Sequence, residues 1–127
     1  MPGAIMAGDF SRESGERAVT ALLDTVPGLT AIFASNDVMA LAALRAMRGR
    51  GLRVPGDVSI AGFDDIPIAS DLWPPLTTVQ VPMGELALRM VVEPSRGSAL
   101  RIEHLPTELV LRASTGRPRP FGVRLKP

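Results

Sequence analysis

The sequence predicts an α/β fold in which a parallel sheet forms the middle of three layers. The stretch Ala31–Asp65 carries most of this prediction, because it runs from a short apolar segment through a long apolar helix to a second short apolar segment. Short segments that are apolar throughout are typical of buried parallel strands. With 127 residues, 46% hydrophobic and 21% charged, the chain suits one globular domain with its own core.

The first third of the chain is expected to hold a strand, a helix and a loop. The apolar run Ala4–Ala7 reads as the end of a strand, and Ser11 can cap the helix that follows. The apolar face of that helix recurs at helical spacing and consists of Ala18, Val19, Leu22 and Leu23. Proline and glycine within Asp24–Thr30 favour a loop before the central unit.

The central unit begins with a strand and a helix. Ala31–Ala34 reads as the strand, and the three residues that follow, Ser35, Asn36 and Asp37, all favour the N-cap of a helix. Val38–Met47 is apolar at almost every position, which predicts a helix covered on more than one side.

A second strand and a pair of acids complete the unit. Val58–Phe63 reads as the strand, and Asp64 and Asp65 follow it directly. Ligands of open α/β sheets bind beyond the carboxyl ends of the strands. Asn36 follows the neighbouring strand, so we expect it to lie at the same edge as the two acids.

The remainder is expected to be less regular. Three prolines argue against a helix in Ile66–Leu76, which reads as a long loop. Thr77–Val81 reads as a strand, and Met83–Val92 as an amphipathic helix that follows a proline. Ile102–Leu111 reads as a last strand, and residues 116–127 as a loose basic tail.

Composition excludes several functions. The chain has no cysteine and a single histidine, His104, which excludes disulfides, thiol catalysis and a multi-histidine metal site within one chain. No catalytic motif is present, so we expect neither an enzyme nor a cofactor. The net charge of +1 gives no argument for nucleic-acid binding. No apolar run is long enough to span a membrane and no secretory leader is visible, so we expect a cytoplasmic protein.

Four ordered segments resemble a known family. They are GDFSRESG (residues 8–15), Thr30–Pro67, PPLTTV (residues 74–79) and LPTELVLRAST (residues 105–115). Together they resemble the effector-binding core of the lactose-repressor/galactose-repressor (LacI/GalR) family of bacterial transcription regulators. The resemblance implies a type I periplasmic-binding-protein-like fold and a small effector, either a sugar or a nucleobase-like molecule.

The resemblance implies three ligand-binding residues: Phe10, Asn36 and Asp64. Phe10 would stack on a ring-shaped ligand, although it could instead pack under the following helix. Asn36 would hydrogen-bond the ligand, whereas its residue type alone predicts only an N-cap. Asp64 would accept hydrogen bonds from ligand hydroxyls, although a plain turn-former is an equal reading. Asp65 reads as structural, capping the turn that follows.

The resemblance also implies association and truncation. Leu41, Ala42 and Leu72 match the family's dimer surface, although ordinary core is the alternative, so we expect a homodimer or a higher homo-oligomer. Residues 1–115 would form the C-terminal portion of the effector domain, and residues 76–94 a crossover and a helix of an N-terminal subdomain that the sequence lacks. The DNA-binding headpiece is lacking as well, so we expect no specific DNA binding and weak sugar binding. The alternative function is a type I periplasmic sugar-binding protein of a transporter.

Overall fold

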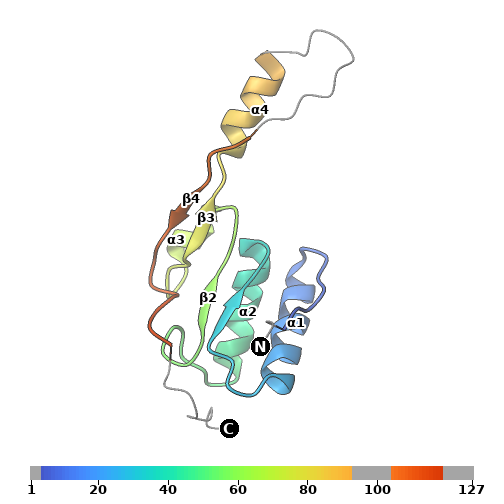
Figure 1. Cartoon of the computed structure of the whole chain (residues 1–127), viewed down its shortest axis with the longest axis vertical. Helices are drawn as coiled ribbons and strands as arrows, with labels where there is room; N and C mark the ends of the chain where they lie inside the picture. Colours follow the sequence, from blue (N-terminus) through green and yellow to red (C-terminus); the bar gives the residue numbers. More distant parts are fainter. Residues whose placement is uncertain (1–3, 93–103, 119–127) are drawn as a thin grey trace.

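A computed structural model describes residues 4–92 and 104–118 (Figure 1). Three sequence-based expectations lie partly outside the described residues: the end of the segment 76–94, the start of the strand Ile102–Leu111 and most of the tail 116–127. The elements are α1 (Arg12–Thr25), β1 (Ala31–Phe33), α2 (Asp37–Gly49), β2 (Ser59–Ala61), α3 (Ile68–Asp71), β3 (Thr78–Gln80), α4 (Met83–Val92) and β4 (Glu108–Val110).

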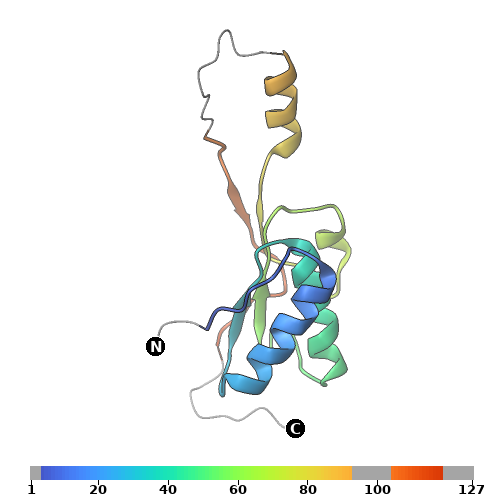
Figure 2. The same cartoon turned by 90° about the vertical axis from the view of Figure 1, so that its right-hand side faces the viewer.

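The strands confirm the α/β prediction with its parallel pairing. β1 and β2 are parallel, with Ile32 opposite Ile60. Single parallel bridges continue the pairing from β2 and the turn after it toward β3, at Ala61 opposite Thr77 and at Asp64 opposite Gln80. β4 pairs with β3 in the antiparallel direction. Side by side, β3 and β4 form a two-stranded stem that leads away from the body (Figures 1 and 2).

The helices α1 and α2 pack against each other on one side of β1 and β2 (Figure 2). Both begin where the sequence predicts. The Ser11 hydroxyl accepts from the Ser14 N–H at 3.1 Å, and the Asn36 carboxamide oxygen accepts from the Met39 N–H at 2.8 Å. The core between these helices, the sheet and α3 consists of Val19, Ala34, Met39, Ala40, Ala43, Leu44, Met47, Val58, Ile60, Ala69 and Leu76.

The strand predicted at Ala4–Ala7 is wrong. The segment forms no strand, and the Ile5 side chain is 92% exposed. A strand forms only when a neighbour satisfies its N–H and C=O groups. Within the described part of the chain, β1 pairs with β2 alone, and no ladder reaches Ala4–Ala7.

The prediction that prolines exclude a helix from Ile66–Leu76 is also wrong. α3 begins directly after Pro67, whose φ of −50° is already helical. Proline is tolerated at the start of a helix because the N–H that it lacks would have no helical partner there. The Ser70 hydroxyl donates to the Pro67 carbonyl at 2.9 Å and closes the short turn.

The last predicted strand is shorter than expected. Within the described residues 104–111, Glu108–Val110 forms the strand, while His104 lies exposed in the segment before it.

α4 has the predicted boundaries but stands apart from the body (Figures 1 and 2). None of its residues is buried, and Arg89 pairs with Glu85 at 2.6 Å within the helix. Its exposed apolar side chains are Met83, Leu88, Met90, Val91 and Val92. The stem therefore presents an apolar helix to the surroundings.

The contact between α1 and α2 yields a stability prediction. A Cβ added at Gly15 would lie 2.8 Å from the backbone of Met39, whereas one added at Gly49 would meet nothing within 4 Å. We expect Gly15→Ala to lower the free energy of unfolding by about 1–3 kcal/mol, because the two helices must move apart. The control Gly49→Ala should raise it by up to ~1 kcal/mol through helix propensity. Urea unfolding followed by circular dichroism measures both; equal effects would contradict a close helix contact at Gly15.

Candidate functional site

The structure brings the three predicted ligand-binding residues to one edge of the sheet. The Asn36 carboxamide N–H donates to the Phe10 carbonyl at 3.1 Å, which joins the turns that precede α1 and α2. The Asp37 N–H donates to the Phe63 carbonyl at 2.9 Å, which joins the start of α2 to the residue before Asp64. All three residues thus lie beyond the carboxyl ends of the strands, the edge where open α/β sheets bind ligands.

Asn36 combines the N-cap role with a place at this edge. Its carboxamide oxygen caps α2 through Met39, and one of its N–H bonds holds Phe10. The other N–H bond has no protein partner among the residues that the structure describes. The half-buried side chain can therefore donate one hydrogen bond outward without giving up the cap.

Phe10 does not pack under α1, so that alternative is wrong. Its side chain is 63% exposed, and its φ of 66° lies in the left-handed region. A bulky residue rarely adopts this conformation, and such strain is most often stored at functional sites. The ring face is left open at the site edge.

Asp64 combines burial, strain and a free carboxylate. Its φ is 107°, and the residue is half-buried. Within the described residues its carboxylate makes no hydrogen bond or ion pair. Burial, together with the negative charge of nearby Asp37, raises the pKa of Asp64 above its ordinary value. A half-buried carboxylate without a protein partner costs some stability, which makes Asp64 a candidate for binding a ligand.

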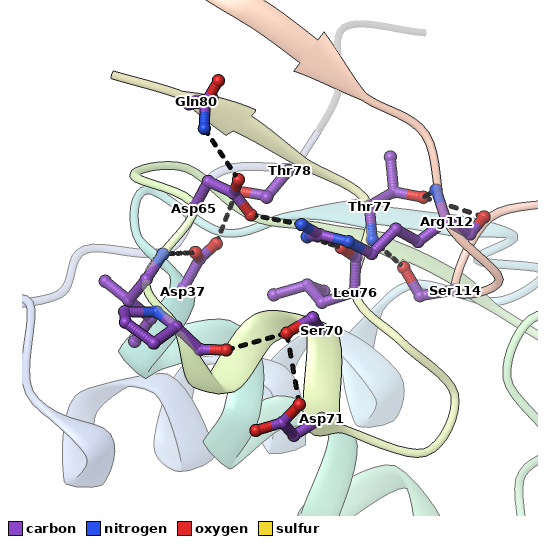
Figure 3. A network of polar contacts seen from close by, with 12 residues as sticks. Asp37, Asp65, Ser70, Asp71, Leu76, Thr77, Thr78, Gln80, Arg112 and Ser114 are labelled. Atoms are coloured by element: carbon purple, nitrogen blue, oxygen red, sulfur yellow. Dashed lines mark hydrogen bonds and ion pairs between the residues drawn. The ribbon is translucent and has the colours of Figure 1, made fainter. Parts of the chain in front are cut away.

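Asp65 contacts the stem rather than capping the turn that follows it. Its carboxylate forms an ion pair with Arg112 at 2.6 Å, and the Gln80 carboxamide donates to it at 3.4 Å (Figure 3). The other end of the Arg112 guanidinium donates to the Leu76 carbonyl at 2.8 Å. The expected structural role is therefore present, but it connects distant segments.

Asp37 is the residue whose importance the sequence analysis missed. It is 1% exposed, and its two carboxylate oxygens accept from the Thr78 hydroxyl at 2.6 Å and from the Ile66 N–H at 2.9 Å (Figure 3). A Cβ at Gly62 would collide with this carboxylate, so a glycine is required there. The sequence predicted Asp37 only as one of three candidates for the N-cap of this helix.

The residues predicted for the dimer surface are buried or half-buried within the protomer. Ala42 is 6% exposed and belongs to the core, as its alternative reading had it. Leu41 is half-buried beside a hollow between α1 and α2, and Leu72 is half-buried against the core cluster. An interface through Leu41 and Leu72 stays a prediction.

The described residues lack a metal site and a membrane-spanning helix. They contain no group of three or more histidine, cysteine or acidic side chains that could hold a metal ion. They also contain no helix that is both long and apolar enough to cross a membrane.

Comparison with protein families and curated sequences identifies relatives. Residues 3–115 match the model of a periplasmic binding protein-like domain. The chain is 42% identical over 107 residues to the HTH-type transcriptional regulator CelR of Thermobifida fusca, covering 82% of this chain and 30% of CelR. It is 40% identical over 111 residues to a lactose operon repressor sequence of Rhizobium radiobacter, covering 84% of this chain and 97% of that sequence. The chain spans about a third of the length of CelR and of several other relatives.

Solved structures that resemble this chain are also of transcriptional regulators. A LacI-type transcription regulator from Bifidobacterium animalis subsp. lactis matches with a TM-score of 0.77 and 36% identity over 87% of this chain and 41% of that one. The CelR–cellobiose complex matches with a TM-score of 0.70 and 38% identity, covering 84% and 34% of the two chains. A LacI family regulator from Arthrobacter sp. FB24 in complex with lactose matches with a TM-score of 0.72 and 31% identity, covering 89% and 44%.

The adjacent acids Asp64 and Asp65 should respond oppositely to loss of charge. Because Asp64 is unpaired and its pKa is raised, Asp64→Asn should increase the free energy of unfolding at neutral pH. Asparagine also tolerates positive φ. Asp65→Asn should reduce stability, because it leaves the largely buried Arg112 without its ion-pair partner.

The pH dependence gives the sign of the Asp64 effect. As the pH falls through the raised folded-state pKa, Asp64 becomes protonated and regains the stability that its charge cost. The difference between the wild type and Asp64→Asn should therefore shrink in acid. Urea unfolding across a pH series measures it, and a less stable Asp64→Asn at neutral pH would show that the Asp64 carboxylate supports the fold.

Proposed function

This chain belongs to the LacI family of transcriptional regulators, and from that premise we propose that its effector-binding domain binds a small sugar at the edge formed by Phe10, Asn36 and Asp64. The relatives' names supply the ligand class, since matching structures were solved with cellobiose and with lactose. We also propose that sugar binding changes the DNA binding of the whole regulator.

The unpartnered carboxylate of Asp64 is the observation that carries this proposal. Its main chain is fixed, its side chain is half-buried, and its oxygens have no protein donor among the described residues. A carboxylate accepts hydrogen bonds only and can take two sugar hydroxyls at once. Such bonds would replace the hydration that the carboxylate loses on partial burial, so ligand binding would offset its desolvation free energy.

The two neighbouring residues complement that acceptor. The free N–H bond of Asn36 can donate to a hydroxyl or ring oxygen, which a carboxylate cannot do. The exposed ring of Phe10 can cover the apolar face of a pyranose. An acceptor, a donor and an apolar surface together suit a sugar ring better than an ion or a purely apolar ligand.

The transporter alternative finds no specific observation in its favour. The relatives reported above are transcriptional regulators. We therefore place the function in the cytoplasm, where a regulator meets DNA, and assign the DNA contact to a helix-turn-helix unit of the kind that the name of CelR implies.

Sugar binding should be weak and local to the site edge. Phe10, Asn36 and Asp64 approach a ligand from one side, whereas good pockets bury ~70–90% of a ligand, so we expect dissociation constants on the order of millimolar. Titration of the ¹⁵N-labelled chain with cellobiose and lactose should shift the amide signals of these three residues. Asp64→Asn should abolish the shifts.

A matched control removes a carboxylate at the other end of the helices. Asp24 pairs with Arg50 at 2.6 Å near the C-terminal ends of α1 and α2. Asp24→Asn should leave the sugar-induced shifts unchanged. Shifts that survive in Asp64→Asn would place the binding elsewhere.

We also propose that the chain associates with a second copy. The support is exposed apolar surface: Trp73 is 81% exposed and Ile68 is 44% exposed beside Leu72, and the apolar side of α4 is uncovered. Large apolar surfaces of this kind usually mark interfaces.

Association should be measurable by mass and by fluorescence. Trp73 is the only tryptophan, so burial in an interface should shift its emission to the blue as the concentration rises. We expect light scattering at micromolar concentration to report a dimer or larger, and Leu72→Asp to weaken it by at least about tenfold. The exposed-site control Arg48→Asp should not. A monomer mass at all concentrations would end the proposal.

A further inference from the structure

We propose that Asp65 and Arg112 are positioning residues that clamp the Asp64 turn to the β3–β4 stem, so that the place of Asp64 and the place of the stem change together. This inference rests on the proposed effector site, because Asp64 is the ligand-binding group that the clamp would hold.

The first step is that three consecutive residues of the turn are each fastened to a different segment. The Asp64 N–H donates to the Val79 carbonyl of β3 at 2.9 Å. Asp65 is paired with Arg112, which follows β4. The Ile66 N–H donates to the buried Asp37 at the start of α2 at 2.9 Å. A turn with positive φ at Asp64 and at Asp65 persists only when its surroundings hold it.

The second step is that Arg112 reaches both sides of the crossing between body and stem. One end of its guanidinium meets Asp65, and the other donates to the Leu76 carbonyl two residues before β3 (Figure 3). Its own main-chain N–H donates to the Thr77 hydroxyl at 3.0 Å. The side chains of Arg112 and Asp65 are 18% and 10% exposed, so solvent screens the pair little.

The third step is that a small set of contacts joins the turn to the stem. β3 and β4 pair with each other over three residues each, and the described part of α4 shows no close packing against the body. The Asp65–Arg112 pair, the Gln80 contact and the Val79 carbonyl link the site turn to the stem directly. Buried Asp37 adds an indirect link, since it accepts from Ile66 of the turn and from Thr78 of β3. A movement of Asp64 on binding a sugar would pass to the stem through these links, and stem movement would shift Asp64 in return.

The test compares two ion pairs of equal length in opposite places. Asp65→Asn breaks the pair at the turn, whereas Asp24→Asn breaks the 2.6 Å pair with Arg50 at the far end of the helices. We expect Asp65→Asn to raise hydrogen exchange at the amides of Asp64 and Ile66 by roughly tenfold or more relative to that at Ile60 in the core. Asp24→Asn should leave this ratio unchanged. Arg112→Lys should keep only part of the wild-type protection, because one ammonium group cannot reach Asp65 and the Leu76 carbonyl in the way that the two ends of a guanidinium do.

A second measurement follows the coupling itself. In the wild type, cellobiose should shift the amide signals of Gln80 and Leu109 in the stem as well as that of Asp64. In Asp65→Asn the shift at Asp64 should remain while those in the stem fall by at least about half.

The outcomes separate this inference from the proposed function. Unchanged exchange at Asp64 and Ile66 in Asp65→Asn, in the absence of any sugar, would overturn the clamp. Absence of cellobiose and lactose binding in the wild type would overturn the proposed function, while the exchange comparison would still decide the clamp. Stem signals that shift equally in the wild type and in Asp65→Asn would show that the coupling takes another route.

Discussion

The buried carboxylate of Asp37 is the constraint on which the site edge depends. It draws together the start of α2, the turn after β2 and the first residue of β3, through one main-chain N–H and one hydroxyl. An ionised group with 1% exposure is tolerable only when such donors replace water. Its charge also contributes to the raised pKa of Asp64, so the group that builds the turn makes the neighbouring acid more costly.

Beyond the paired strands, side-chain hydrogen bonds attach the segment after β4 to the sheet. Ser114 is completely buried, and its hydroxyl accepts from the Thr77 N–H at 2.7 Å and donates to the Ile60 carbonyl at 2.6 Å. Gly116 continues the attachment, since its N–H donates to the Ser59 hydroxyl at 3.1 Å. These contacts explain the serine and threonine residues of PPLTTV and LRAST, to which the sequence analysis assigned no role. The segment after β4 is thus attached to the body by these hydrogen bonds, although it forms no regular strand there.

Local signals predicted the local elements well. Ser11, Asn36 and Pro82 mark helix starts by their own chemistry, and the structure begins α1, α2 and α4 there. Prediction failed where the deciding partner lies elsewhere in the chain: Ala4–Ala7 has no neighbouring strand to complete it.

The candidate site shows the same limit. The sequence predicted Asp37 only as an N-cap candidate, because its partners Ile66 and Thr78 lie 29 and 41 positions away. The edge shared by Asn36 and Asp64 was predictable, since parallel topology alone brings the ends of adjacent strands together. The positive φ of Asp64 was not, because it follows from contacts with β3, α2 and Arg112.

The bond from Asn36 to Phe10 has an evolutionary consequence. It is made to the main-chain carbonyl, so every amino acid at position 10 preserves it. The side chain itself is largely exposed and holds no part of the core. Mutation at this position can therefore exchange the surface offered to a ligand while the scaffold stays intact, and smaller residues that accept positive φ would even relax the backbone. Under the proposed function, ligand preference can therefore change at position 10 under weak structural selection, which makes this position a starting point for altering that preference by directed evolution.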